Sequence, residues 1–253
     1  MSDSENLGAP GKDPAAESTR TEQADTQATA TPPGSIGEGF DPSVATYTTL
    51  QKEEVGVGPH PQPWPVGEQY DPELLAEGDR RNVLDRYRYW KREAIIADID
   101  LHRHDLDVAI ENFEHDFNIG SVVRSANAFA VGCVHIVGKR RWNRRGAMVT
   151  DRYQHLLHHP TVEDMVKWAK ADGRAIIAVD NVPASKPIEK VELPKHALMV
   201  FGQEGPGVSE ETLAAADLVV AISQFGSTRS LNVGAAAAIA MHSWIVQHAD
   251  IPT

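Results

Sequence analysis

Apolar residues divide the chain into a polar first quarter and an apolar remainder. Residues 1–62 hold almost no large apolar side chain before Val55 and are rich in Ala, Thr, Gly, Pro and acidic residues. Such a segment cannot bury enough surface to offset the entropy that it would lose on ordering. We therefore expect a disordered acidic tail over residues 1–62 and a folded part of about 190 residues.

The pattern over residues 63–104 predicts a connector followed by a helix. Prolines at alternate positions make a stiff, extended connector: Pro59, Pro61, Pro63 and Pro65. Asp71 and Pro72 suit the N-cap and first turn of a helix. Apolar residues then recur at helical spacing up to residue 98, with arginines between them. We expect a basic amphipathic helix over residues 71–98 that packs on the main domain.

From residue 105 onward, strand patterns and helix patterns alternate. The predicted strands are 106–110, 134–137, 175–179, 197–201 and 218–222, and the predicted helices are 120–129, 161–171 and 233–246. The strand at 175–179 has no polar position, as expected of a strand buried on both faces of a parallel sheet. The alternation predicts an α/β fold with a mostly parallel sheet and helices on both faces.

The charge of the chain is distributed unevenly. A formal net charge of −12 argues at first against a nucleic-acid partner. The acidic excess, however, is strong in the tail, whereas the folded part contains two basic clusters. One lies within residues 80–92, and the other is the segment Lys139-Arg140-Arg141-Trp142-Asn143-Arg144-Arg145. The total charge therefore understates the local positive potential.

The cysteine content and the lengths of the apolar runs indicate the cellular compartment in which the protein acts. The single cysteine, Cys133, excludes an intrachain disulfide and fits a reducing compartment. No apolar run approaches the ~20 residues of a membrane span. The N-terminal residues lack the basic and apolar regions of a signal peptide. We therefore expect a cytoplasmic protein without a membrane partner.

A glycine-rich loop follows the predicted strand 197–201. Its sequence is Gly202-Gln203-Glu204-Gly205-Pro206-Gly207. Glycines just past the carboxyl end of a strand let a ligand approach the backbone, although a tight turn between strand and helix would explain them equally well. The spacing differs from the G-x-G-x-x-G of dinucleotide sites, which disfavours a nicotinamide cofactor and a Rossmann-type oxidoreductase.

Two further polar segments adjoin predicted helices. The first runs from Asn118-Ile119-Gly120 to Arg124, at the start of the helix 120–129. The second, Ser230-Leu231-Asn232-Val233-Gly234, opens the last helix, where Ser230 or Asn232 would also suit an N-cap. By itself, an arginine on a helix is most often a solvated surface residue.

In this order and spacing, the three segments resemble the three motifs of the SpoU/TrmH family of RNA ribose 2′-O-methyltransferases, part of the SPOUT class. The resemblance covers residues 105–253. It implies a deep trefoil knot in the C-terminal part of the chain, one of the few exceptions to unthreaded topology. It also implies methyl transfer from S-adenosylmethionine to a ribose 2′-hydroxyl of tRNA or rRNA. A short helix before the catalytic domain favours the branch that modifies guanosine 18 of tRNA.

The resemblance also assigns roles to single residues. The implied catalytic set is Arg124, Asn118, Glu204, Ser230 and Asn232, and the implied cofactor-binding set is Val179, Gly202, Gly205, Ile222, Ser230 and Leu231. Arg124 is expected at the target ribose. Because a guanidinium is a poor base, two roles stay open for it: removing the hydroxyl proton in an unusual environment, or stabilising the developing alkoxide.

Three positions depart from the family pattern. His115-Asp116-Phe117 stands where many members have a proline, Ala130 stands where a glycine is common, and Ile222-Ser223 replaces Ile-Pro. The last change is expected to alter the bend of the cofactor loop. None of the three removes an implied catalytic side chain. We therefore favour an active methyltransferase over the alternative, a catalytically inactive RNA-binding protein of the same fold.

The remaining expectations concern partners and metals. The density of cations predicts an RNA-binding set of Arg140, Arg141, Trp142, Arg144 and Arg145, with Trp142 as a surface for base stacking. The alternative is a solvated loop paired with acidic residues of the same chain. The arginines of the helix 71–98 are a second candidate for RNA contact. The family implies a homodimer, for which the last helix offers apolar surface at Met241, Trp244 and Ile245. His155 and His159 would share one face of a helix, but no further ligand accompanies them, so no metal site is expected.

Overall fold

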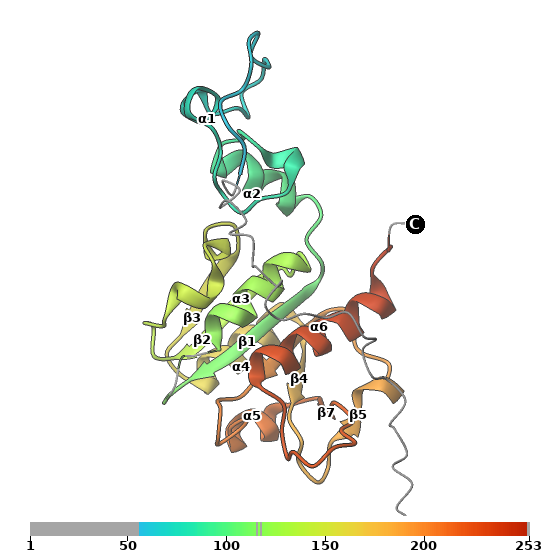
Figure 1. The fold of residues 1–253 in the computed structure, drawn as a ribbon. Coiled ribbons are helices and arrows are strands. Elements are labelled where there is room, and N and C mark those ends of the chain that lie inside the picture. The colour runs from blue at the N-terminus through green and yellow to red at the C-terminus, as the bar shows by residue number, and fades with distance from the viewer. Residues whose placement is uncertain (1–55, 115, 117, 252–253) are drawn as a thin grey trace, which may run out of the picture. The chain divides into compact units, whose positions relative to one another are not determined.

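The computed structural model describes residues 56–251 except 115 and 117 (Figure 1). Most of the predicted tail lies outside these residues, but residues 56–62 lie within them. Val57 exchanges two backbone hydrogen bonds of 2.9 Å with Asp79, and the backbone N–H of His60 donates to the carbonyl of Leu75 at 2.9 Å. Because these bonds fix residues 57–60 to the segment 75–79, the folded part begins earlier than the composition predicted.

Within the described residues, seven strands form one sheet in the order β3-β2-β1-β6-β4-β7-β5. Their bounds are β1 Leu106–Asn112, β2 Cys133–Gly138, β3 His155–His159, β4 Ala175–Val179, β5 Lys186–Pro187, β6 Ala197–Phe201 and β7 Leu218–Ala221. Every pair of neighbouring strands is parallel. The predicted α/β fold with a parallel sheet is therefore confirmed. The knot that the resemblance implies stays an expectation.

Helices cover both faces of this sheet (Figure 1). Their bounds are α1 Pro72–Glu77, α2 Arg92–Asp100, α3 Ile119–Ala128, α4 Val162–Asp172, α5 Glu210–Ala215 and α6 Val233–His248, with 3-10 turns η1 Asp85–Tyr87, η2 Arg144–Ala147, η3 Thr150–Arg152 and η4 Ile188–Lys190. Helices α3 and α6 share one apolar cluster with the sheet, and α4 shares another. None of the helices in this part of the chain is both long enough and apolar enough to cross a membrane.

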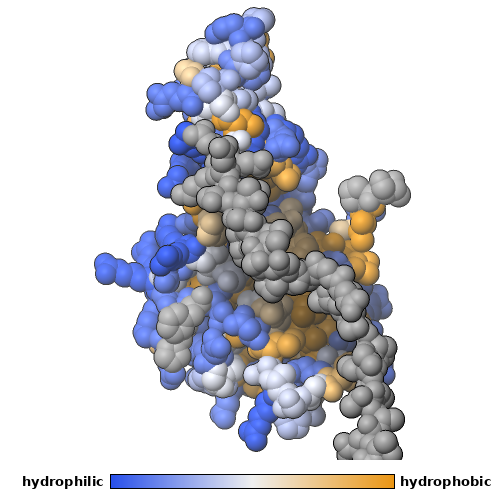
Figure 2. Space-filling view, in the orientation of Figure 1, coloured by the Kyte–Doolittle hydropathy of each residue, from blue (hydrophilic) through white to orange (hydrophobic). Residues whose placement is uncertain are grey.

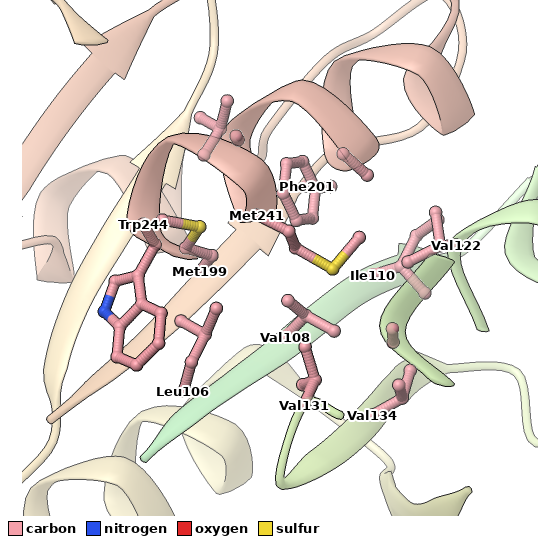
Figure 3. Packing of buried hydrophobic residues seen from close by; sticks show 14 of the residues in the cluster. Leu106, Val108, Ile110, Val122, Val131, Val134, Met199, Phe201, Met241 and Trp244 are labelled. Atoms are coloured by element: carbon pink, nitrogen blue, oxygen red, sulfur yellow. The ribbon is translucent and has the colours of Figure 1, made fainter. Parts of the chain in front are cut away.

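The two-residue period of the strands distributes their side chains between these two clusters. In β1, Leu106, Val108 and Ile110 belong to the cluster with α3 and α6, whereas Ala109 belongs to the cluster with α4. Figure 3 shows the first cluster, with Met241 of α6 close to the side chains of β1. Because both faces are covered, the strands carry the continuous apolar runs that made them recognisable in the sequence.

Helix α6 does not offer the apolar surface that we expected. Met241 is 0% exposed and Trp244 is 1% exposed, because both close the core against the sheet (Figure 3). Ile245, the third expected residue, is half-buried, and the large apolar side chains that α6 exposes are Ile239 (41%) and Val246 (57%). Figure 2 shows apolar residues gathered over this helix. A dimer surface on α6 would therefore use its outer side chains.

The helix expected over residues 71–98 is wrong in its middle. Asp71 caps α1 as predicted, but α1 ends at Glu77, before Gly78 with a φ of +97°. The buried carboxylate of Asp79 then accepts hydrogen bonds from the backbone and guanidinium of Arg81 and from the backbone N–H of Tyr89. Burial raises the pKa of Asp79, but these hydrogen bonds outweigh it and hold the pKa below its usual value. Asp79 therefore organises a compact turn where the periodicity predicted a continuous helix.

Candidate active site

The carboxyl ends of β4, β6 and β7 meet at one edge of the sheet and open onto a pocket of about 450 Å³. Val179 is the last residue of β4, Gly202 follows β6, and Ile222 follows β7. In open parallel sheets, ligands bind in the crevice outside the carboxyl ends of the strands. The fold therefore forms a pocket at the place where the sequence predicted a binding site.

Every residue that the resemblance assigned to the cofactor lines this pocket: Val179, Gly202, Gly205, Ile222, Ser230 and Leu231. Two of the implied catalytic residues, Glu204 and Asn232, line it as well. The structure thus brings the second and third motifs together around one cavity.

The glycine loop after β6 is closed on itself. Gln203 and Gly207 exchange two backbone hydrogen bonds of 3.1 Å. A Cβ atom at Gly202 would lie 1.9 Å from the carbonyl carbon of Gly207, so no other residue fits this position without moving the backbone. Gly205 and Gly207 have φ values of +103° and +77°, which glycine adopts without strain. The tight-turn explanation therefore holds, and the ligand-site explanation stays a prediction.

Two acidic residues that we did not single out in the sequence fix this loop from outside. The carboxylate of Asp180, directly after β4, accepts a hydrogen bond of 2.7 Å from the backbone N–H of Val208. Glu111 on β1 accepts hydrogen bonds from the backbone and hydroxyl of Ser209 and from the hydroxyl of Thr212. The only signal in the sequence was an acidic residue at or just beyond the end of an apolar strand.

A chain of hydrogen bonds joins all three motifs at the mouth of the pocket. The side-chain amide of Asn118 donates to Oε2 of Glu204 at 2.8 Å. The side-chain amide of Asn232 donates to Oδ1 of Asn118 at 2.9 Å. The oxygen of the same Asn232 side chain accepts from the backbone N–H groups of Gly234 and Ala235 at 2.9 and 3.3 Å, which caps α6. Capping and the link between motifs are therefore carried by different atoms of one side chain.

The serine at position 223 uses hydrogen bonds that a proline cannot make. Its backbone N–H donates to Oε1 of Glu189 at 3.0 Å, and its hydroxyl donates to Oε2 at 2.9 Å. Burial raises the pKa of Glu189, but the hydrogen bonds to its carboxylate outweigh burial and lower the pKa below its usual value. Where the family commonly has the rigid ring of a proline, this chain thus has a serine that is hydrogen-bonded to Glu189.

Arg124 does not line this pocket. It lies on α3, six residues and therefore ~9 Å along the helix axis from Asn118. Its side chain is exposed and borders a different pocket, beside the N-terminal residues 82–102. The structure therefore brings four of the five implied catalytic residues to one pocket region and leaves Arg124 outside it, within one copy of the chain.

In the basic segment after β2, residues 139–145, the arginines differ in whether they form an ion pair. Arg140, Arg141 and Arg145 are exposed and form no ion pair with any described residue. The Arg144 guanidinium lies 5.5 Å from the centre of the Trp142 ring and 3.2 Å from Oδ2 of Asp151. Trp142 is half-buried against the apolar cluster of α3 and α6. Of the arginines in this segment, Arg144 therefore pairs with an acidic residue of the same chain, as the alternative to RNA binding predicted.

The histidines of residues 155–159 lie on β3, so they do not form one face of a helix. His159 is buried, and its Nε2 lies 2.8 Å from Nδ1 of His135, whose Nε2 lies 3.1 Å from Oδ2 of Asp107. Burial and the neighbouring His135 lower the pKa of His159 to about 4. Within the part of the chain that the structure describes, no group of three or more His, Cys, Asp or Glu side chains is arranged to hold a metal ion.

Known proteins share this architecture. The model of the SpoU rRNA Methylase family matches residues 105–242. The tRNA (guanosine(18)-2′-O)-methyltransferase of Borreliella burgdorferi is 27% identical over 172 residues, which are 66% of this chain and 79% of that protein.

Two solved structures have a similar fold. The A. aeolicus TrmH/SpoU tRNA modifying enzyme has a TM-score of 0.56 at 23% identity, over 62% of this chain and 81% of that one. The SpoU methyltransferase AviRb from Streptomyces viridochromogenes, in complex with the cofactor AdoMet, has a TM-score of 0.53 at 21% identity, over 59% and 63% of the two chains.

Proposed function

Because this chain belongs to the SpoU rRNA methylase family, we propose that it transfers a methyl group from S-adenosylmethionine to a ribose 2′-hydroxyl of RNA. A tRNA nucleotide of the guanosine-18 type is the proposed target, in line with the name of the relative from Borreliella burgdorferi. The observation that carries this proposal is the hydrogen-bonded chain Asn232–Asn118–Glu204, which unites three separate motifs at one pocket.

The pocket suits S-adenosylmethionine in its groups as well as its position. The Oε1 atom of Gln224, which lines the pocket, is buried without a hydrogen-bond partner among the described residues. A buried acceptor of this kind favours a ligand that carries N–H donors, as the amino groups of S-adenosylmethionine do. Val179, Gly202, Gly205, Ile222, Ser230 and Leu231 would hold it. When bound, the cofactor supplies a methyl group activated by its sulfonium sulfur.

The chain's own polar groups would position the ribose. Glu204 and Asn232 are exposed at the pocket's mouth, and Asn118 fixes their separation through its two hydrogen bonds. In-line transfer requires the hydroxyl oxygen, the methyl carbon and the sulfur to be held in one geometry. A rigid polar rim serves this requirement because its members are already bonded to one another before RNA arrives.

The position of Arg124 supports a homodimer. Within one copy Arg124 faces away from the cofactor pocket, so a role at the ribose requires RNA that spans both places or a second copy of the chain. Helices α3 and α6 pack side by side and expose Arg124, Ile239 and Val246. An isologous contact through these helices would bring Arg124 of one protomer towards the pocket of the other. We therefore include a two-fold dimer and a shared site in the proposal.

An inactive RNA-binding protein of this fold is the competing function. All the implied catalytic side chains are present, and three of them form the bonded rim, which favours the enzyme. A cytoplasmic location, where tRNA is modified, completes the proposal.

The test uses the full chain, S-adenosylmethionine with a labelled methyl group, and two RNA substrates: unmodified tRNA transcripts with guanosine at position 18, and unmodified ribosomal RNA. We expect label in RNA, at a nucleotide that mass spectrometry identifies as 2′-O-methylated. Label in ribosomal RNA alone would contradict the tRNA assignment. Binding of cofactor and RNA with no transfer to either would favour the inactive protein.

A further inference from the structure

A second pocket, of about 430 Å³, lies between the N-terminal residues 82–102 and helix α3. Leu84 and Tyr87 line it from the N-terminal side, Arg124 and Asn127 line it from α3, and Tyr153 completes it. Tyr87 and Tyr153 are buried and belong to one small apolar cluster with Ile95. The pocket is distinct from the cofactor pocket, since the two share no lining residue.

One polar atom in this pocket lacks a partner. Nδ2 of Asn127 is buried and makes no hydrogen bond within the described part of the chain. Leaving a buried donor unsatisfied costs free energy, so such groups in native proteins call for an explanation. A ligand with an acceptor at its edge would satisfy the amide, whereas a wholly apolar ligand would leave it unpaired.

The other walls offer flat apolar surface and positive charge. The hydroxyl of Tyr87 is bonded to Asp98 at 2.6 Å, which fixes the ring in place. The guanidinium of Arg86 lies 4.6 Å from the centre of that ring and is ion-paired with Asp98 at 3.6 Å. Arg124 lines the pocket as a cation with no ion pair among the described residues. Apolar walls, one unpaired donor and one unpaired cation together match a nucleotide: a base with apolar faces and a polar edge, attached to an anionic backbone.

We propose that this pocket receives the base of the nucleotide whose ribose is methylated. The inference rests on the proposed function. Enzymes that do chemistry on a base extrude it and hold it by stacking and by hydrogen bonds to its edge. We infer that the base next to a reacting ribose is held here in the same way. Here Asn127 donates to an acceptor of the base edge. Arg124, which borders the pocket, then lies at the ribose and phosphate attached to that base.

The test combines a protein variant whose pocket is filled by a larger side chain with an RNA substrate that lacks the base. Leu84 is 65% exposed at the edge of the pocket, so Leu84→Trp fills space without disturbing the core. Leu101, which is 78% exposed and does not line the pocket, gives the matched control Leu101→Trp. The RNA substrates are a tRNA transcript and the same RNA with an abasic ribose, its 2′-hydroxyl intact, at the mapped methylation position.

We expect wild type to lose at least about tenfold in kcat/KM on the abasic RNA, the size of one lost base contact. Leu84→Trp should lose a similar factor on intact RNA and nothing further on abasic RNA, because both changes remove the same contact. Leu101→Trp should behave as wild type. Equal rates of wild type on the two RNAs, or additive losses for Leu84→Trp, would overturn the base pocket.

Asn127→Leu separates a binding role from a structural one. The substitution keeps the approximate size and removes the unpaired amide, so we expect kcat/KM on intact RNA to fall while Tm stays the same or rises. A lower Tm with unchanged kcat/KM would show that Asn127 is structural and would contradict the inference. If wild type methylates no RNA at all, the proposed function fails first and the base pocket fails with it.

Discussion

Asn118 and Asn232 lie 114 positions apart in the chain and share a hydrogen bond of 2.9 Å, from the amide of Asn232 to the side-chain oxygen of Asn118. The same Asn232 side chain caps α6 with its other atom. One residue thus sets both the start of the last helix and the position of the first motif. Substitutions that affect the two atoms differently can separate folding from catalysis.

Asn232→Asp keeps an oxygen for the helix cap and removes the donor to Asn118. We expect Tm to change by no more than a few degrees and methyl transfer to fall at least about tenfold, because Asp and Asn are similar N-caps. Asn232→Ala removes both interactions and should lower Tm as well, since a lost cap costs ~1 kcal/mol. Thermal melts and initial rates test this. Equal rates for wild type and Asn232→Asp would show that the link is dispensable.

Arg124→Ala should abolish methyl transfer and leave the affinity for S-adenosylmethionine within about twofold, because Arg124 borders no part of the cofactor pocket in its own copy of the chain. Arg124→Lys keeps a charge but loses the planar guanidinium, so we expect only a small part of the rate to return. Isothermal titration measures the cofactor and single-turnover assays measure transfer. More than a tenth of wild-type turnover in Arg124→Ala, at unchanged RNA affinity, would refute the assignment.

The exposed cations after β2 should determine much of the salt dependence of RNA binding. Changing Arg140, Arg141 and Arg145 to Ala removes three charges that have no partner among the described residues, while Trp142 and Arg144 keep the core intact. We expect the slope of log affinity against log salt to flatten by ~2, at about 0.7 per phosphate contact. The triple variant Lys167→Ala, Lys170→Ala, Lys190→Ala is the control. An unaltered slope would move the RNA surface to the arginines of residues 80–92.

The buried His159 predicts a loss of stability in mild acid. Its pKa in the folded chain is about 4, below the ordinary 6.5, so between these values the unfolded chain binds more protons. The free energy of unfolding is therefore highest above pH ~6.5 and falls as the pH drops towards 4. We expect Tm to fall by at least about 2–4 °C over this range, the effect of 1 kcal/mol in a domain of this size.

His159→Gln should weaken that fall, because glutamine has no proton to gain. His102→Gln removes an exposed imidazole and should leave the fall in place. Melting curves between pH 4 and 7, measured for all three proteins, make the comparison. A fall of equal size in wild type and His159→Gln would assign it to other groups.

The outer side chains of α6 should determine the oligomeric state. Val246→Asp places a charge on that outer surface, and in an isologous contact each copy would meet its partner's charge or a desolvated carboxylate. We expect a monomer by light scattering and at least about a tenfold loss of methyl transfer. Val66→Asp, at a valine that is 98% exposed elsewhere, is the control. A wild-type monomer with full activity would contradict the dimer.

The parallel sheet could be predicted because its strands are buried on both faces. Five of the strands came directly from apolar runs, and their observed bounds differ by two residues or fewer. Strand β3 was missed because His155, His158 and His159 interrupt its apolar pattern. The two residues of β5 leave no periodic signal at all.

The site could be predicted where residue type is dictated by the backbone or by the ligand. Gly202 falls in this class because a Cβ atom would clash with the backbone, and Gly207 because its φ is +77°. Asp180 and Glu111 were missed because they act through hydrogen bonds to distant backbone groups, which no local pattern reveals. The separation of Arg124 from the cofactor pocket could not be predicted either, since a sequence motif gives the order of residues along the chain but not the direction in which each side chain points.

The dependence of the pocket on α6 has a consequence for synthesis of the protein. Asn118 and Glu204 leave the ribosome first, but the residue that links Asn118 to the last helix is Asn232, and its position depends on a helix that ends at His248. A nascent chain that stalls before this helix lacks the rim of the site, and its sheet also lacks Met241 and Trp244, which close the core. Premature termination or proteolytic trimming of α6 would therefore yield fragments that retain the basic segment after β2 but not the complete catalytic apparatus.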